Sequence, residues 1–82
     1  MRITFEELSC KEVVNICDGK RLGYTENLEI NMVDGKIISL IIPGPSKMFG
    51  LIQSQEDYVI PFGKIVKVGD DVILVEYDHI SG

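Results

Sequence analysis

The chain has 82 residues and a mass of 9.2 kDa, which is the size of one domain. Hydrophobic residues make up 45% of it and charged residues 26%, which excludes a disordered segment of low hydrophobicity. Eight basic and thirteen acidic residues give a net charge of −5, without the basic footprint that nucleic-acid binding usually leaves. No apolar run is long enough to span a membrane, and the charged residues after Met1 are unlike a secretory signal. We therefore expect a cytoplasmic protein without direct contact to a membrane or to nucleic acid.

The N-terminal third predicts one helical turn and then a strand. Thr4 and Glu7 have the spacing of a capping box, which satisfies two free backbone donors at the start of a helix. Residues 11–16 contain several β-branched side chains and favour a strand. Asp18-Gly19 then predicts a turn, because glycine adopts positive φ without strain.

A longer strand is expected from residue 22 onward. Near its end, Leu28, Ile30 and Met32 alternate with polar residues, and a period of two predicts one buried face and one exposed face. Asp34-Gly35 is a strong signal for a hairpin turn. The apolar run that follows, residues 37–42, predicts a central strand that is covered on both faces.

The second half predicts further short strands at residues 58–60, 64–68 and 72–77, followed by a frayed polar tail at 78–82. Turn signals recur every 8–15 residues or so, and no segment keeps a helical period. This pattern favours an all-β barrel or sandwich in a single domain of residues 1–82.

Residues 44–57 are unusually apolar for a connection, because they contain Met48, Phe49, Leu51 and Ile52. One interpretation is an additional hairpin that covers the barrel. The other is a projecting loop that docks on another chain, and the two do not exclude each other. These four residues are the candidate partner-binding site.

The chain has no motif for catalysis, a metal or a cofactor. Cys10 and Cys17 lack the second ligand pair of a structural zinc site, so we expect two reduced thiols, one or both of which act as small apolar side chains. His79 lies in the polar tail without an orienting partner, and the paired carboxylates are adjacent residues of strands or turns. No phosphate-binding loop is present. We expect a protein without enzymatic activity and without a cofactor.

Several short segments, in order along nearly the whole chain, resemble the PRC-barrel domains. They are Glu7-Leu8-Ser9, Asp18-Gly19, Leu22-Gly23, Asp34-Gly35-Lys36-Ile37, Leu40-Ile41-Ile42-Pro43-Gly44, Asp57-Tyr58-Val59-Ile60-Pro61 and Asp71-Val72-Ile73. More narrowly, the chain resembles the small stand-alone YlmC/YmxH-type members that are linked to sporulation in endospore-forming bacteria. Phe62 departs from the tryptophan expected there, and Cys10 departs from a glycine.

The resemblance implies a small PRC-type β-barrel of about six antiparallel strands with short helical turns, which works through protein contact. It implies a non-enzymatic protein-interaction module associated with sporulation. Its partner would be a protein of unknown identity, with a homodimer as one form of the assembly. The alternative is an accessory protein of ribosome or RNA processing, because related domains occur at the end of a ribosome-maturation factor. The two hypotheses differ in salt dependence, since phosphate contacts weaken steeply with ionic strength and apolar docking does not.

If Phe49 and Leu51 form an interface, the double change Phe49→Ser, Leu51→Ser will reduce association and leave the thermal midpoint almost unchanged. If both side chains lie in the core, the same change will lower the midpoint strongly, because polar hydroxyls would replace buried apolar groups. Sedimentation and thermal melts of this variant distinguish the two. A monomeric wild type with an unstable variant would contradict the interface.

Overall fold

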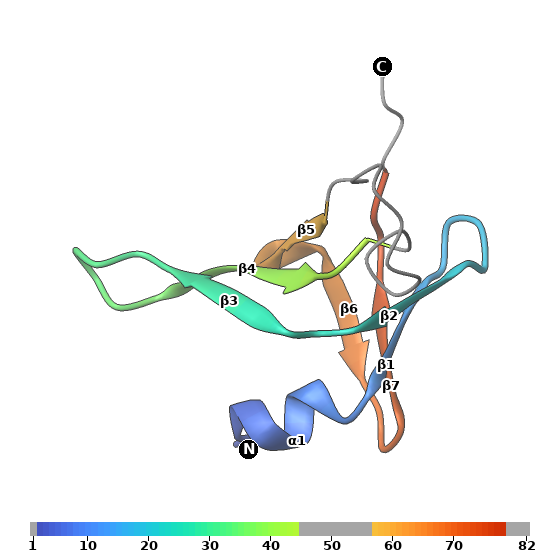
Figure 1. Cartoon of the computed structure of the whole chain (residues 1–82), viewed down its shortest axis with the longest axis horizontal. Helices are drawn as coiled ribbons and strands as arrows, with labels where there is room; N and C mark the ends of the chain where they lie inside the picture. The colour runs from blue at the N-terminus through green and yellow to red at the C-terminus, as the bar shows by residue number, and fades with distance from the viewer. Residues whose placement is uncertain (1, 45–56, 79–82) are drawn as a thin grey trace.

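The computed structural model describes residues 2–44 and 57–78. Within them the chain forms seven strands, one short α-helix and one 3-10 turn (Figure 1). In chain order the elements are α1 (Phe5–Ser9), β1 (Glu12–Asn15), β2 (Arg21–Tyr24), β3 (Asn27–Ile30), β4 (Ile37–Ile42), β5 (Tyr58–Pro61), η1 (Phe62–Lys64), β6 (Ile65–Val68) and β7 (Val72–Val75). The all-β class expected from the sequence is therefore confirmed.

The strands form two sheets that share one core. The first sheet has the order β2-β1-β7-β6 and the second the order β3-β4-β5. The chain passes from the first sheet to the second between β2 and β3, and it returns through η1 between β5 and β6. Among the described residues no strand ladder joins the two sheets, so the barrel is not closed.

Two details differ from the expected strand arrangement. The single strand expected from residue 22 is divided into β2 and β3, because the chain changes sheet at Thr25 and Glu26. The pairing of β1 with β7 is parallel, with Glu12 opposite Val72 and Asn15 opposite Val75, whereas every other strand pair is antiparallel. A parallel pair needs a long crossover connection, and here the rest of the described barrel supplies it.

The core is small and is built from both sheets and the helix. Its buried apolar side chains are Leu8, Val13, Leu22, Leu40, Ile42, Ile60, Ile73 and Val75. Four half-buried side chains pack around them, namely Leu28, Tyr58, Ile65 and Tyr77. A core of this size does not cover every apolar side chain of the described chain, and several large ones stay exposed around it.

The hairpins β1–β2 and β3–β4 have the same turn. Residues 15–20 and 31–36 both read Asn-x-x-Asp-Gly-Lys, a short internal repeat that the analysis of the sequence did not identify. In each turn the glycine N–H donates to the carbonyl of the asparagine at 2.7 Å, and the asparagine N–H donates to the carbonyl of the lysine. Gly19 and Gly35 have φ of 72° and 74°, so the turns expected at these glycines are confirmed, as four-residue rather than two-residue loops.

The two asparagines of this repeat have different surroundings. Asn15 is buried, and its side chain donates to the Tyr77 carbonyl at 2.6 Å and accepts from the backbone N–H of Tyr77 and of Cys17. Asn31 lies at the exposed end of the β3–β4 hairpin, where its side chain accepts from the N–H of Val33 at 2.8 Å. Asn15 therefore joins the first turn to the chain that follows β7.

We expect Asn15→Ala to lower the free energy of unfolding by about 2–4 kcal/mol, because it removes three part-buried hydrogen bonds to the backbone of Tyr77 and Cys17. Asn31→Ala is the matched control and will cost about 1 kcal/mol or less, since it removes one exposed bond from the same turn. Urea denaturation of both variants measures the difference. Equal losses would show that the bonds to Tyr77 contribute nothing net.

Helix α1 is a single turn held by a complete capping box. The Thr4 hydroxyl accepts from the Glu7 N–H at 3.1 Å, and the Glu7 carboxylate accepts from the Thr4 N–H at 2.9 Å, as the spacing of these residues predicts. The bond from the Thr4 N–H, and then the bond from its hydroxyl, lower the pKa of Glu7 below the ordinary value of 4.5. A slight desolvation opposes this shift, and the charge of Lys11 adds to it.

Within residues 2–44 and 57–78, no helix is long and apolar enough to cross a membrane.

A lowered pKa in the folded state stabilises the helix only while Glu7 is ionised. This stabilisation is complete above pH 4.5 and is lost as the pH falls through the lowered pKa of the folded state. In amide NMR spectra we expect the protection of α1 to decrease in this acid range. Glu7→Gln will remove the pH dependence, whereas Glu6→Gln, which removes a charge from the same turn outside the box, will retain it. A pH-independent helix in the wild type would contradict the role of the carboxylate.

Candidate protein-interaction surface

The β3–β4 hairpin projects from the rest of the molecule and exposes apolar side chains. We call residues 27–42 the wing (Figure 1). Ile30 is 50% exposed, and Met32 and Val33 in its turn are 91% and 95% exposed. The prediction of a buried face at positions 28, 30 and 32 is therefore wrong for Ile30 and Met32. The outer half of the wing extends past the core, and of these three side chains only Leu28 packs against it.

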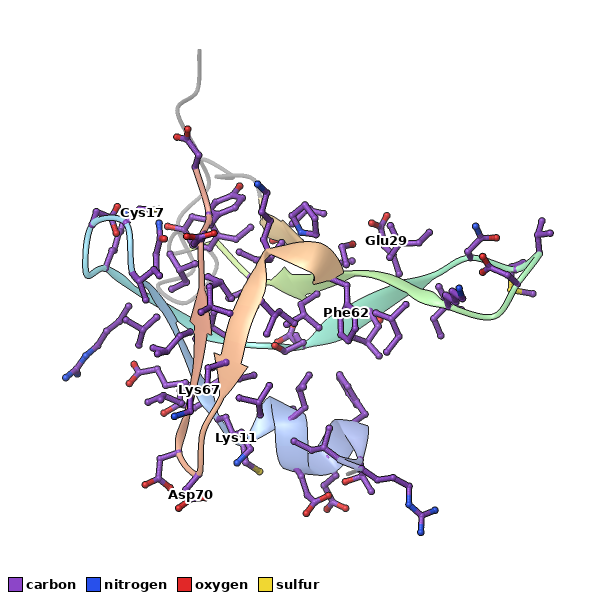
Figure 2. All side chains as sticks on the ribbon, turned by 180° about the vertical axis from the view of Figure 1, so that it is seen from behind. Lys11, Cys17, Glu29, Phe62, Lys67 and Asp70 are labelled. Atoms are coloured by element: carbon purple, nitrogen blue, oxygen red, sulfur yellow. The ribbon has the colours of Figure 1, made fainter. Side chains whose placement is uncertain are left out.

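An apolar groove of about 430 Å³ lies between the wing and helix α1. Each of its three walls contributes exposed or half-buried side chains: Ile3 and Phe5 from the N-terminal segment, Leu28 and Ile37 from the wing, and Phe62 and Val68 from the return to the first sheet. Phe62 lies in the space between the wing and α1 (Figure 2). The buried side chains of Leu8 and Leu40 also line the groove, so it opens directly onto the core.

Among the described residues that line the groove, none has a titratable side chain. Thr4 is the one polar residue of this described lining, and the capping box with Glu7 already uses the Thr4 hydroxyl. Glu29 of the wing points away from Phe62, from the opposite face, and accepts a hydrogen bond from Ser39 (Figure 2). The other charged residues of the wing, Asp34 and Lys36, lie at its turn and are exposed. The described lining of this groove therefore offers apolar contact and shape.

The residues that the sequence indicated as a partner-binding site, Met48, Phe49, Leu51 and Ile52, lie outside the described residues. Their role stays a prediction.

The two cysteines are free and do not lie in the core. Cys10 follows α1 and Cys17 lies in the first turn, and both are exposed, so the expectation that at least one packs as a small apolar side chain is wrong. Among the described residues no three metal-ligating side chains gather at one place. The absence of a metal stays a prediction.

Neither the groove nor the exposed end of the wing was predicted from the sequence, although one signal was available. The repeated Asn-x-x-Asp-Gly-Lys pattern places Met32 and Val33 at the same turn positions as Ile16 and Cys17. Recognising the repeat would have assigned Met32 to a turn instead of to the buried face of a strand. The groove has no comparable signal, because its walls come from three distant parts of the chain.

Comparison with known proteins agrees with this architecture. A family model described as the PRC-barrel domain matches residues 2–80. The probable sporulation protein YlmC of Bacillus subtilis (strain 168) is 44% identical over 73 residues, which cover 89% of this chain and 90% of that protein. The uncharacterized protein YmxH of the same strain is 43% identical over 72 residues, 85% of this chain and 84% of that protein. A third relative, from Clostridium acetobutylicum, is 41% identical over 69 residues, 84% of this chain and 78% of that protein. The resemblance found in the sequence is thereby confirmed, and the chain belongs to the PRC-barrel domain family.

Proposed function

We propose that this PRC-barrel protein is a non-enzymatic protein-interaction module that acts in sporulation. The apolar groove and the wing beside it carry this proposal. Of the thirteen large hydrophobic residues that are exposed within the described part of the chain, nine lie here: Ile3, Phe5, Ile30, Met32, Val33, Ile37, Ile38, Phe62 and Val68. A concentration of exposed apolar side chains on one side of a small protein is typical of an interaction surface.

Burial of this surface would contribute free energy to binding. Complete burial of one aromatic or large aliphatic side chain contributes about 1.5–3 kcal/mol before the costs of association are subtracted. Half-exposed residues such as Phe5 and Phe62, at 43% and 45%, still have apolar surface to lose on contact. A partner that fills the groove would also cover the surface of Leu28 and Ile37 that the core leaves exposed.

The biological setting of the proposal comes from the relatives. The name of the Bacillus subtilis relative YlmC describes it as a probable sporulation protein, and it aligns over most of both chains. A cytoplasmic location is part of the proposal, and the two exposed free thiols support it, because such thiols are typical of reducing compartments.

Replacement of Phe62 in the sporulating host tests this function. We expect Phe62→Ser to lower the yield of heat-resistant spores, because it removes an aromatic wall of the groove. Val66→Ser is the matched control: Val66 is 53% exposed on the next strand but does not line the groove, and we expect it to sporulate normally. Both proteins must accumulate to wild-type levels, which immunoblots establish.

Equal spore yields from the two variants would contradict a role for the groove in sporulation. Co-sedimentation with ribosomal particles that weakens steeply with salt would contradict an apolar docking module and support the ribosome- or RNA-associated alternative.

A further inference from the structure

We propose that Asp34, in the turn at the end of the wing, is a site of spontaneous isoaspartate formation, whereas Asp18 in the matching turn is protected. An Asp-Gly pair is prone to this modification, because glycine has no side chain to keep its amide nitrogen away from the aspartate carboxyl group. The chain has two such pairs, and both continue into lysine, as Asp18-Gly19-Lys20 and Asp34-Gly35-Lys36. The local chemistry is therefore matched, and the structure decides which site reacts.

The reaction needs no enzyme and no reagent besides water. The Gly35 nitrogen attacks Cγ of the protonated Asp34 carboxyl group and forms a C–N bond. The carboxyl hydroxyl and the amide proton leave together as water, which gives a five-membered succinimide. Water then opens the ring at either carbonyl group: one opening restores aspartate, and the other leads the backbone through Cβ, which is isoaspartate. Nothing is oxidised or reduced, and the final mass equals the initial mass.

In the closed turns both reacting groups are already engaged in hydrogen bonds. The Gly35 N–H donates to the Asn31 carbonyl at 2.7 Å, and the Asp34 side chain accepts from the Lys36 N–H at 3.0 Å. The equivalent two bonds of the first turn measure 2.7 Å and 2.9 Å. The glycine nitrogen therefore reaches the carboxyl carbon only after the turn opens, so the rate at each site follows the free energy of local opening.

The first turn is anchored in the core. Asn15, whose carbonyl accepts the glycine N–H of this turn, is 1% exposed, and its side chain is bonded to Tyr77 and Cys17. Strand β1 stays paired with β7 up to the turn, because Asn15 lies opposite Val75 and the Ile16 N–H donates to the Val75 carbonyl at 2.9 Å. Opening this turn therefore disturbs buried hydrogen bonds and the parallel pairing.

The second turn lies where, among the described residues, no third strand supports the hairpin. Strand β5 pairs with β4 from Ser39 onward, so the last pair before the turn, Ile30 with Ile37, belongs to a ribbon of two strands. The register of this ribbon also shifts between Glu29 and Ile30. A hairpin of two strands is marginally stable in water, so this turn opens at a lower cost than the first.

The test is to age the purified wild-type protein at neutral pH and to map its peptides. Electron-transfer fragmentation distinguishes isoaspartate from aspartate, although the two have the same mass. We expect isoaspartate to accumulate at Asp34 at least about tenfold faster than at Asp18, because frayed and anchored segments differ widely in opening free energy. Equal rates, a faster reaction at Asp18, or no isoaspartate at Asp34 would overturn the proposal.

Unfolding supplies the control for local chemistry. In guanidinium chloride that unfolds the chain, both Asp-Gly pairs will react at similar rates, because neither turn exists. If Asp34 reacts faster there by the same factor, the neighbouring residues cause the difference and the proposal is wrong. Hydrogen exchange of the folded protein measures opening without the covalent step, and the Gly35 amide will exchange faster than the Gly19 amide. Equal exchange would contradict the difference between the turns.

Removal of the anchor tests its role. We expect Asn15→Ala to raise the rate of isoaspartate formation at Asp18 and to leave the rate at Asp34 unchanged, whereas Asn31→Ala will not raise the rate at Asp18. An unchanged rate at Asp18 in folded Asn15→Ala would contradict the anchoring. Asp34 is not among the described residues that line the groove, so failure of this proposal leaves the proposed interaction function unaffected.

Discussion

The parallel pairing of β1 with β7 is the constraint on which the rest of the molecule depends. It joins the beginning of the barrel to its end, with Val13 opposite Ile73 and Asn15 opposite Val75. Val13, Ile73 and Val75 are buried apolar residues of the core. Asn15 forms the hydrogen bonds to Tyr77 that continue the pairing beyond the strand. Backbone bonds from Glu12 to Asp71 and from Ile16 to Val75 extend it in both directions. This pairing therefore positions the two central strands of the first sheet relative to each other.

The small core explains why the groove and wing exist. In the described part of the chain, eight buried apolar side chains hold two sheets and one helical turn together. Two of them, Leu40 and Ile42, belong to the inner half of the wing, and the core does not extend to Ile30 or Met32. Helix α1 contributes only Leu8 to the core, so the space between the helix and the wing is left open and is lined mostly by exposed or half-buried side chains.

The sequence predicted the local elements well, because each had a local cause. The capping box at Thr4 and Glu7, the positive φ of Gly35 and the end of β5 at Pro61 follow from the residues themselves. The alternation of residues 28–32 was misleading, since a period of two predicts a face but not whether the core is wide enough to cover it. The parallel register of β1 and β7 and the groove depend on residues far apart in the sequence, which no local pattern indicates.

The two turns with the same hydrogen-bond pattern also have a consequence for the order of folding. Hairpins β1–β2 and β3–β4 close loops of a few residues, and such hairpins form within about 1–10 μs. Glu12 and Val72, by contrast, are paired across 60 positions of the chain, from residue 12 to residue 72. Closing so long a loop costs more entropy, and contacts of high sequence separation slow folding. The matched turns therefore supply two preformed hairpins, and the slow step is the search in which the last strand finds the first.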